Sequence, residues 1–275
     1  MRSRADQESV AKGANRDGHG RLRGLFLRPP IIPFLTAGFP SPSVFREAAL
    51  AAFESGAGAL EIGMPFSDPL ADGPAIQHSS HEALRRGITL AKVLEMTARL
   101  RQSLPIPIFL MGYLNPMMRM TLDTFAKRAF AAGADGTIVP DCPLDEAGEW
   151  IGISRRRHLA NVFLIAPTTP DERISRIDRL STLFSYCVAV TGVTGVRAQV
   201  AADTQSYLRR VRRQTRKPFV VGFGISSPDH VRALLPYADG FAVGSALVPL
   251  LGRRPSERPA MAVGRMVAAL ARATS

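Results

Sequence analysis

The sequence predicts one closed barrel of eight parallel strands, each followed by a helix. Short apolar segments alternate with longer amphipathic segments, and this pair recurs eight times after residue 30. Repeated strand-then-helix units indicate a parallel sheet covered by helices. The chain has 275 residues, which suits a (β/α)8 TIM barrel of about 250 residues. An open dinucleotide-binding sheet would carry GxGxxG after its first strand, and residues 36–40 (TAGFP) do not supply it.

The predicted strands are short apolar runs bounded by Gly, Pro or Asp. They span residues 31–36, 59–62, 106–112, 136–139, 162–166, 184–190, 219–222 and 240–243.

The predicted helices carry apolar residues at spacings of three and four, which gives each helix one buried face. They span residues 43–55, 90–104, 122–132, 145–157, 171–180, 204–214, 227–235 and 258–271. Residues 249–259 are expected to form a loop before the last helix. No linker divides the body, so residues 29–275 are expected to form one α/β domain.

Residues 1–28 are expected to be a flexible, basic N-terminal extension. They are polar and rich in glycine, and no apolar run follows Met1, so a secretory signal is not expected. The acidic residues in this segment argue against a transit peptide. Leu22, Leu25 and Phe26 are candidates for a short segment that covers the bottom of the barrel.

The composition indicates a globular chain with a large core, since 46% of the residues are hydrophobic and 21% are charged. No run approaches the roughly 18 apolar residues of a membrane span. The net charge of +12 fits a basic surface or attraction to anions. The arginines are scattered over several helices without interleaved aromatic residues, so nucleic-acid binding is not expected. Two distant cysteines, Cys142 and Cys187, predict free thiols and a cytoplasmic location.

The second predicted strand contains a carboxylate, Glu61, between Leu60 and Ile62. Side chains alternate along a strand, so Glu61 points away from the side that its two neighbours face. The active site of this fold lies at the carboxyl ends of the strands. A buried carboxylate there is unfavourable unless it is used or paired, and desolvation raises its pKa. We expect Glu61 to move protons, with a structural ion pair as the alternative.

A loop rich in Pro and Gly follows this strand and contains Asp68 and Asp72. Asp–Pro and Asp–Gly pairs are common turn formers, so turn chemistry explains each aspartate as well as a site does.

Polar and aromatic candidates occur near other strand ends. Tyr113 and Asn115 follow the third strand, and Asp141 follows the fourth. Tyr186 lies within the sixth strand, where a pocket and the core are equally good interpretations. His78 and His81 are read as residues on a helix surface. The sequence has no HExxH pattern or Cys/His cluster that predicts a metal site.

Glycine-rich segments follow the last three predicted strands, at residues 191–195 (TGVTG), 222–226 (GFGIS) and 243–245 (VGS). Barrels often bind phosphate with the loops after strands seven and eight and a nearby helix N-terminus. Glycine lets backbone N–H groups approach phosphate oxygens, and the helix end adds a favourable field. We expect these late loops to bind a phosphate group.

Residues 61–77 resemble the signature of the tryptophan synthase alpha subunit family. Supporting motifs occur in the family's order over residues 30–270, which makes the resemblance specific. They are 33–40 (PFLTAGFP), 111–116 (MGYLNP), 139–143 (VPDCP), 191–197 (TGVTGVR), 222–227 (GFGISS) and 243–248 (VGSALV).

The resemblance implies a lyase that splits indole-3-glycerol phosphate into indole and glyceraldehyde 3-phosphate by a retro-aldol reaction. It implies no cofactor or metal in this chain. It also implies a beta subunit partner, in an alpha2beta2 complex, that carries pyridoxal phosphate and uses the indole to make L-tryptophan.

The resemblance also implies roles for single residues. Glu61 is the catalytic glutamate, and Asp72 is the aspartate beside the indole nitrogen. Residues implied to contact the substrate are Tyr113, Tyr186, Thr194 and Phe223. Residues implied to bind the phosphate are Gly195, Gly222, Gly224, Gly244 and Ser245. Residues implied to face the beta subunit are Asp68, Pro69, Asn115 and Pro143.

The sequence departs from the family at its start. Pro29 and Pro30 shorten or break the amphipathic helix that usually precedes the first strand. Phe39 replaces the more usual Asp or Tyr. Three alternatives remain: a stand-alone lyase of a secondary pathway, a non-catalytic activator of a beta subunit, and a nucleic-acid-binding protein suggested by charge alone.

Overall fold

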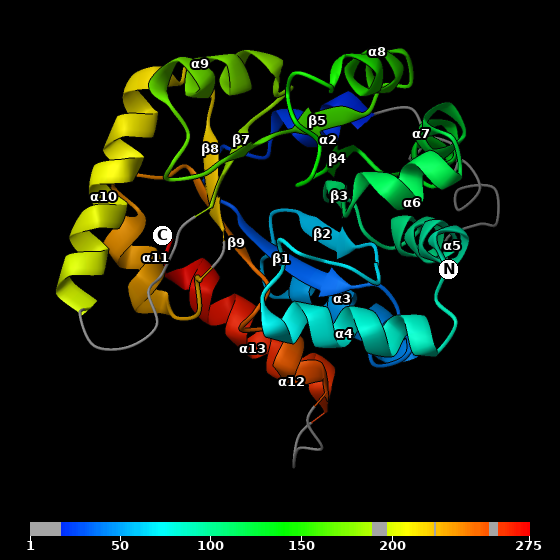
Figure 1. The fold of residues 1–275 in the computed structure, drawn as a ribbon. Helices are drawn as coiled ribbons and strands as arrows, with labels where there is room; N and C mark the ends of the chain where they lie inside the picture. The colour runs from blue at the N-terminus through cyan, green and yellow to red at the C-terminus, as the bar shows by residue number, and fades with distance from the viewer. Residues whose placement is uncertain (1–17, 189–196, 223, 253–257) are drawn as a thin grey trace.

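The computed structural model describes residues 18–188, 197–222, 224–252 and 258–275. Within these residues, nine strands form a parallel sheet in the order β5-β4-β3-β2-β1-β9-β8-β7-β6. They are β1 (Ile31–Thr36), β2 (Leu60–Gly63), β3 (Ile108–Met111), β4 (Gly136–Ile138), β5 (Ala160–Val162), β6 (Leu164–Ile165), β7 (Ser185–Val188), β8 (Phe219–Gly222) and β9 (Gly240–Val243). The sheet curls round with the helices on its outside (Figure 1), which confirms the predicted barrel.

The fifth predicted strand is interrupted. It forms β5 and β6, which are separated only by Phe163. β5 pairs with β4 and β6 pairs with β7, so the two pieces together close the ring as one strand. Phe163 stays attached to its neighbours, because its N–H donates to Ser181 Oγ at 3.2 Å and its carbonyl accepts from Tyr186 N at 3.0 Å.

Most predicted helices occur within a few residues of their expected bounds. The helices on the barrel are α3 (Pro42–Glu54), α4 (Pro74–Arg85), α5 (Leu90–Arg101), α6 (Leu114–Arg119), α7 (Leu122–Ala131), α8 (Gly148–Arg156), α9 (Asp171–Leu180), α10 (Arg197–Gln214), α11 (Pro228–Leu234), α12 (Val248–Gly252) and α13 (Pro259–Arg272). The expected loop at 249–259 is wrong at its start, where α12 lies. A helix of five residues is too short to show a periodic apolar pattern.

Helix starts follow the local sequence. Ser41, Thr89 and Ser227 precede α3, α5 and α11, and each hydroxyl accepts a hydrogen bond from the N–H three residues on at 3.3 Å. These caps satisfy N–H groups that have no partner within the helix. Pro42 and Pro228 occupy the first positions of α3 and α11, where a missing N–H is tolerated.

A short helix, α2 (Gly18–Arg23), precedes β1 and lies at the end of the barrel where the strands begin. Leu25, just after it, is buried, and the Phe26 ring packs edge-on against Phe184 with the centroids 5.5 Å apart. These contacts agree with the interpretation of Leu25 and Phe26 as part of a segment that covers the barrel bottom.

A buried ion-pair cluster ties α2 to the barrel. Asp135 lies just before β4, and its side chain has no exposed surface. Its Oδ1 accepts from Arg21 Nη2 at 2.8 Å, and its Oδ2 accepts from Arg101 Nη2 at 2.8 Å. The backbone N–H of Ile108 also donates to Oδ2, at 2.8 Å. Both carboxylate oxygens are therefore satisfied, as a buried charge requires.

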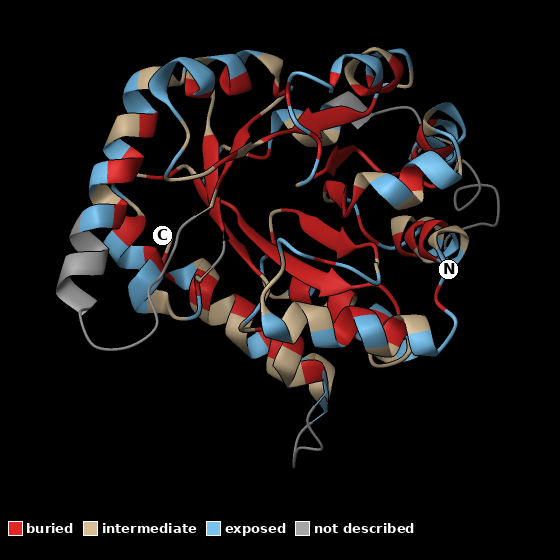
Figure 2. Cartoon of the chain, viewed as in Figure 1, coloured by how far each residue is buried: buried red, intermediate tan, exposed pale blue. Residues whose placement is uncertain are grey.

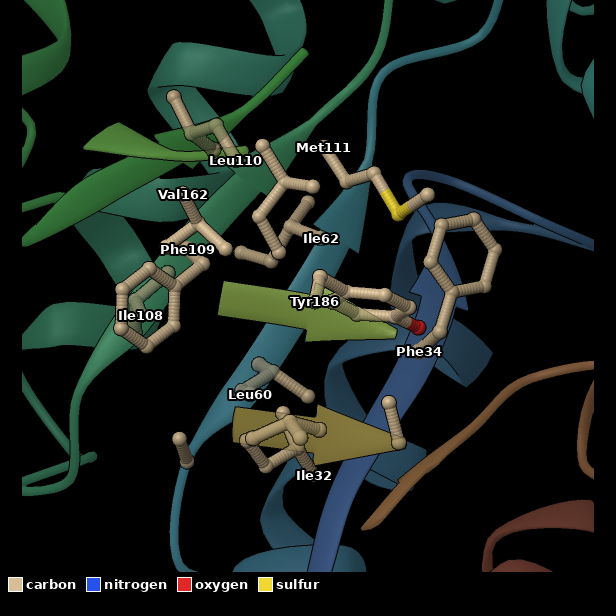
Figure 3. Packing of buried hydrophobic residues seen from close by; sticks show 14 of the residues in the cluster. Ile32, Phe34, Leu60, Ile62, Ile108, Phe109, Leu110, Met111, Val162 and Tyr186 are labelled. Carbon is tan, nitrogen blue, oxygen red and sulfur yellow. The ribbon is translucent and has the colours of Figure 1, made fainter. Parts of the chain in front are cut away.

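The strands are buried on both faces, whereas each helix is buried only toward the sheet (Figure 2). Inside the barrel, Ile32 and Phe109 belong to a layer of fully buried apolar side chains (Figure 3). In the described parts of the chain, no helix combines the length and apolar character that crossing a membrane requires.

Candidate active site

Glu61 is a buried carboxyl with no hydrogen-bond partner. It lies in β2 between Phe34 of β1 and Phe109 of β3 in register, and it is 0% exposed. Neither of its oxygens has a partner among the described residues. Burial raises the pKa of Glu61 from 4.5 to about 8, because the charged form loses its hydration without gaining a compensating contact. No described residue forms the ion pair with Glu61 that was the alternative interpretation.

Asp72 lies in the β2–α4 loop and is partly buried. Burial raises the pKa of Asp72 from 3.8 to about 6, although a hydrogen bond from Tyr113 acts in the opposite direction. The Tyr113 hydroxyl donates to Asp72 Oδ2 at 3.2 Å. It also accepts from the N–H of Ala71 at 2.9 Å. Tyr113, predicted to contact substrate, is therefore hydrogen-bonded to Asp72, the second predicted catalytic carboxyl.

Tyr186 of β7 is affected electrostatically by both carboxyls. Its side chain is buried, and its pKa lies well above the usual value, chiefly through burial and then through the charges of Glu61 and Asp72. Its hydroxyl points toward Phe34 from β1 (Figure 3). Tyr186 is thus buried in the core, as one of the two interpretations held, and it feels the charges of both carboxyls, whereas its contact with a substrate stays a prediction.

Two glycines at this end of the barrel make room for aromatic rings. A Cβ on Gly222 would collide with the Tyr186 ring and hydroxyl, and one on Gly63 would collide with the Phe34 ring. Gly222 was predicted to bind phosphate, which stays a prediction, and the structure shows that the absence of its side chain makes room for the Tyr186 ring.

The remaining described phosphate candidates lie at the ends of β8 and β9. Gly224 has a φ of 111°, which favours glycine. A Cβ added at Gly244 would lie 3.2 Å from the Phe34 side chain. Ser245 is exposed. Three predicted site residues lie outside the described residues: Thr194, Gly195 and Phe223.

The predicted partner-facing residues follow β2, β3 and β4: Asn115 lies in α6 and the others lie in loops. Asp68, Asn115 and Pro143 are exposed, whereas Pro69 is buried. Two apolar side chains beside them are also exposed: Leu70 is 91% and Met118 is 59% exposed. The sequence interpretation missed both, and the available signal was a large apolar residue in an otherwise polar loop or short helix.

Other candidates have structural partners. Asp141 Oδ1 accepts from the N–H of Leu114 at 2.8 Å, at the start of α6. His81 is exposed on α4, as predicted, and its Nε2 contacts the carbonyl of Ser67 at 3.0 Å. No group of three or more His, Cys, Asp or Glu residues in the described ranges is arranged to hold a metal ion. Cys142 and Cys187 are free and buried.

Phe34 was not predicted as a site residue. Its ring fills the space above Gly63, its backbone is in register with Glu61, and it lies beside the Tyr186 hydroxyl in Figure 3. An apolar residue in an apolar strand carries no sequence signal that separates a site from a core.

Comparisons with known proteins identify the family. A family model described as tryptophan synthase alpha chain matches residues 27–273. The tryptophan synthase alpha chain of Chloroflexus aggregans is 46% identical over 233 residues, which cover 84% of this chain and 87% of that protein. That of Geobacter sulfurreducens is 43% identical over 243 residues, covering 88% and 92%.

Solved structures give the same result. The alpha-subunit of a mutant tryptophan synthase from Pyrococcus furiosus has a TM-score of 0.81 and 39% identity, covering 88% of this chain and 98% of that one. A chain from the tryptophan synthase complex of the same organism, described as an a2b2 complex with mutual activation, has a TM-score of 0.83 and 40% identity, with the same coverage.

Proposed function

Because the chain belongs to the tryptophan synthase alpha chain family, we infer that it is the alpha subunit of tryptophan synthase. It cleaves indole-3-glycerol phosphate to indole and glyceraldehyde 3-phosphate. A beta subunit is its partner and consumes the indole. The observation that carries the proposal is the buried carboxyl of Glu61, which has no hydrogen-bond partner among the described residues.

Glu61 supplies the proton that the reaction needs. The bond between indole C3 and the glycerol chain breaks only after C3 is protonated, because the ring must accept the bonding electrons. With a pKa of about 8, the Glu61 carboxyl is mostly protonated at neutral pH and donates this proton. The resulting carboxylate then takes the proton of the hydroxyl on the carbon that leaves as the aldehyde. Glu61 thus ends the cycle protonated, as it began.

Asp72 stabilises the charge that develops on the indole. Protonation at C3 leaves positive character on the ring nitrogen. With a pKa of about 6, Asp72 is mostly ionised at neutral pH, so it accepts a hydrogen bond from the indole N–H as this charge forms. The two carboxyls therefore sit in environments that favour opposite protonation states, as an acid and an electrostatic partner require.

The substrate phosphate is proposed to bind at the carboxyl ends of β8 and β9. We assign Gly222, Gly224, Gly244 and Ser245 to it, together with Gly195, because backbone N–H groups of glycine-rich turns bind phosphate oxygens. Tyr186, Thr194 and Phe223 are proposed to contact the rest of the substrate, and Asp68, Pro69, Asn115 and Pro143 the beta subunit. The reaction is proposed to need no cofactor in this chain, and a cytoplasmic location stays a prediction. Residues 29–275 are proposed to be the catalytic domain, with residues 1–28 as an extension.

The test measures indole release from indole-3-glycerol phosphate by the wild type and Glu61→Gln, with and without a tryptophan synthase beta subunit. Glu61→Gln should lower kcat about 10²- to 10⁴-fold, because it removes general acid–base catalysis but keeps the side-chain volume. A loss below about tenfold would contradict the role of Glu61. Full activity without any gain from a beta subunit would favour a stand-alone lyase. If the wild type releases no indole but stimulates the reaction of the beta subunit, the chain is a non-catalytic activator.

A further inference from the structure

We propose that Gln77 and Tyr113 are positioning residues that hold Asp72 from two sides and fix the turn formed by residues 69–72. The proposal deepens the function above and rests on it, since Asp72 matters for catalysis only if the chain cleaves its indole substrate.

Gln77 holds the backbone of the turn from α4. Its Nε2 donates to the carbonyl of Asp72 at 2.9 Å and to that of Pro69 at 3.4 Å. The turn is also closed by its own backbone, because the N–H of Asp72 donates to the Pro69 carbonyl at 3.0 Å. One side-chain amide thus bridges the first and last residues of the turn.

Tyr113 holds the turn from the end of β3. Its hydroxyl accepts from the N–H of Ala71 and donates to the carboxylate of Asp72. The Tyr113 ring packs against Phe66 with the centroids 5.1 Å apart, which fixes the direction of the hydroxyl. The carboxylate therefore has a fixed orientation as well as a fixed backbone.

Apolar burial does not hold the tip of this turn. Leu70 is 91% exposed and Ala71 is exposed, although Pro69 is buried. Loops with few buried apolar contacts open easily unless their polar groups are bonded. The contacts of Gln77 and Tyr113 therefore have a large share in keeping Asp72 in place. His81, one helical turn after Gln77, extends the same contact to the Ser67 carbonyl.

The ionisable groups that face Asp72 come from separate elements. Tyr113 follows β3, Tyr186 lies in β7 and feels the charges of both Asp72 and Glu61, and Asp141 after β4 acts on Tyr113. The Tyr113 hydrogen bond favours the charged form of Asp72, and burial favours the neutral form. Removing the hydroxyl while keeping the ring should therefore raise the pKa of Asp72.

Tyr113→Phe tests the orienting bond. The acid limb of the kcat/KM profile should move to higher pH, so the loss relative to wild type should be at least about threefold larger at pH 6 than at pH 8. Carbon-13 NMR of labelled aspartate should show the same rise in the Asp72 pKa without relying on activity. An unchanged Asp72 titration would overturn the role of Tyr113.

Gln77→Leu and Gln77→Glu test the backbone bridge, since neither side chain donates a hydrogen bond and Gln77→Glu keeps the shape. Each should lower kcat about tenfold or more in the wild-type background. Each should have little further effect in Asp72→Asn, because the bridge acts through Asp72. Glu82→Gln is the matched control on α4: among the described residues, the Glu82 carboxylate pairs with the exposed Arg85 at 3.0 Å, and its replacement should leave the rate unchanged.

The outcomes separate the two proposals. An inactive wild type would reject the proposed function, whereas NMR would still report the Tyr113 contact. If the wild type is active and the Gln77 variants have the same rate, the positioning role is rejected and the function stands. The same holds if the rate losses caused by the Gln77 and Asp72 substitutions multiply in the double variant.

Discussion

At the scale of single residues, the acid–base pair predicts a bell-shaped pH profile for kcat/KM. Asp72 must be ionised and Glu61 protonated, so activity should fall below pH of about 6 and above pH of about 8. Asp72→Asn should remove the acid limb and keep the alkaline limb. Initial rates from pH 5 to pH 9 check this, and a profile that is flat across both limbs would contradict the assignment.

The contact between Gly222 and Tyr186 predicts a second residue-scale effect. Gly222→Ala adds a Cβ that meets the Tyr186 ring, so the ring must shift beside Glu61. We expect lower kcat/KM and a loss of about 1–3 kcal/mol in the free energy of unfolding, as overpacking typically produces. Gly148→Ala is the control, because a Cβ there meets nothing within 4 Å. Equal behaviour of the two variants would refute the packing role of Gly222.

The sequence identified candidate site residues best where a side chain differed chemically from its neighbours in the same strand. Glu61 stood out as a carboxylate inside an apolar strand. Phe34 did not, because its neighbours in β1 are equally apolar. Tyr186 stayed ambiguous for the same reason, and only the structure shows that it is buried and that the charges of both carboxyls raise its pKa.

At the scale of elements, the buried ion-pair cluster around Asp135 lies at the end of the barrel away from the site. We expect the stability of the fold at that end to be most sensitive to substitutions in this cluster. Asp135→Ala should lower the free energy of unfolding by about 3–5 kcal/mol, because it leaves the charges of Arg21 and Arg101 without their carboxylate. Asp123→Ala, which breaks the exposed pair with Arg157, should have a much smaller effect. Denaturant unfolding measures both, and comparable losses would contradict this distinction.

Most elements with a long periodic pattern were predicted, although the twelve-residue helix α4 was not, and the short helices were missed. α9 has the expected bounds, because ten residues carry a clear apolar stripe. α6 and α12 have six and five residues, less than two turns each. The interruption of the fifth strand at Phe163 depends on pairing with β4 on one side and β7 on the other, which no local pattern contains.

At the scale of the whole molecule, Glu61 makes stability depend on pH. The folded protein keeps a proton on Glu61 up to a pH of about 8, whereas the unfolded chain releases it near pH 4.5. A raised pKa stabilises the fold fully below the unfolded value, and this contribution is lost as pH rises through the folded value.

Wild type should therefore lose stability relative to Glu61→Gln as the pH rises from 4.5 to about 8, by up to about 1.4 kcal/mol for each pH unit. Urea unfolding of both proteins across this range measures the difference. Parallel stability curves would show that the Glu61 carboxyl is hydrated or paired in solution.

The global architecture was the most predictable feature, because eight strand–helix units leave few arrangements that bury every strand. The same repetition does not specify how rings and glycines interlock inside the barrel.

That interlocking limits how the protein can diverge. Phe34 fills the space above Gly63, and Tyr186 fills the space above Gly222. Each ring and its glycine therefore form one evolutionary unit: a larger residue at the glycine position is tolerated only where the ring has become smaller. Across relatives, these positions should covary in pairs, and a laboratory variant that changes both members together should be accepted more readily than either change alone.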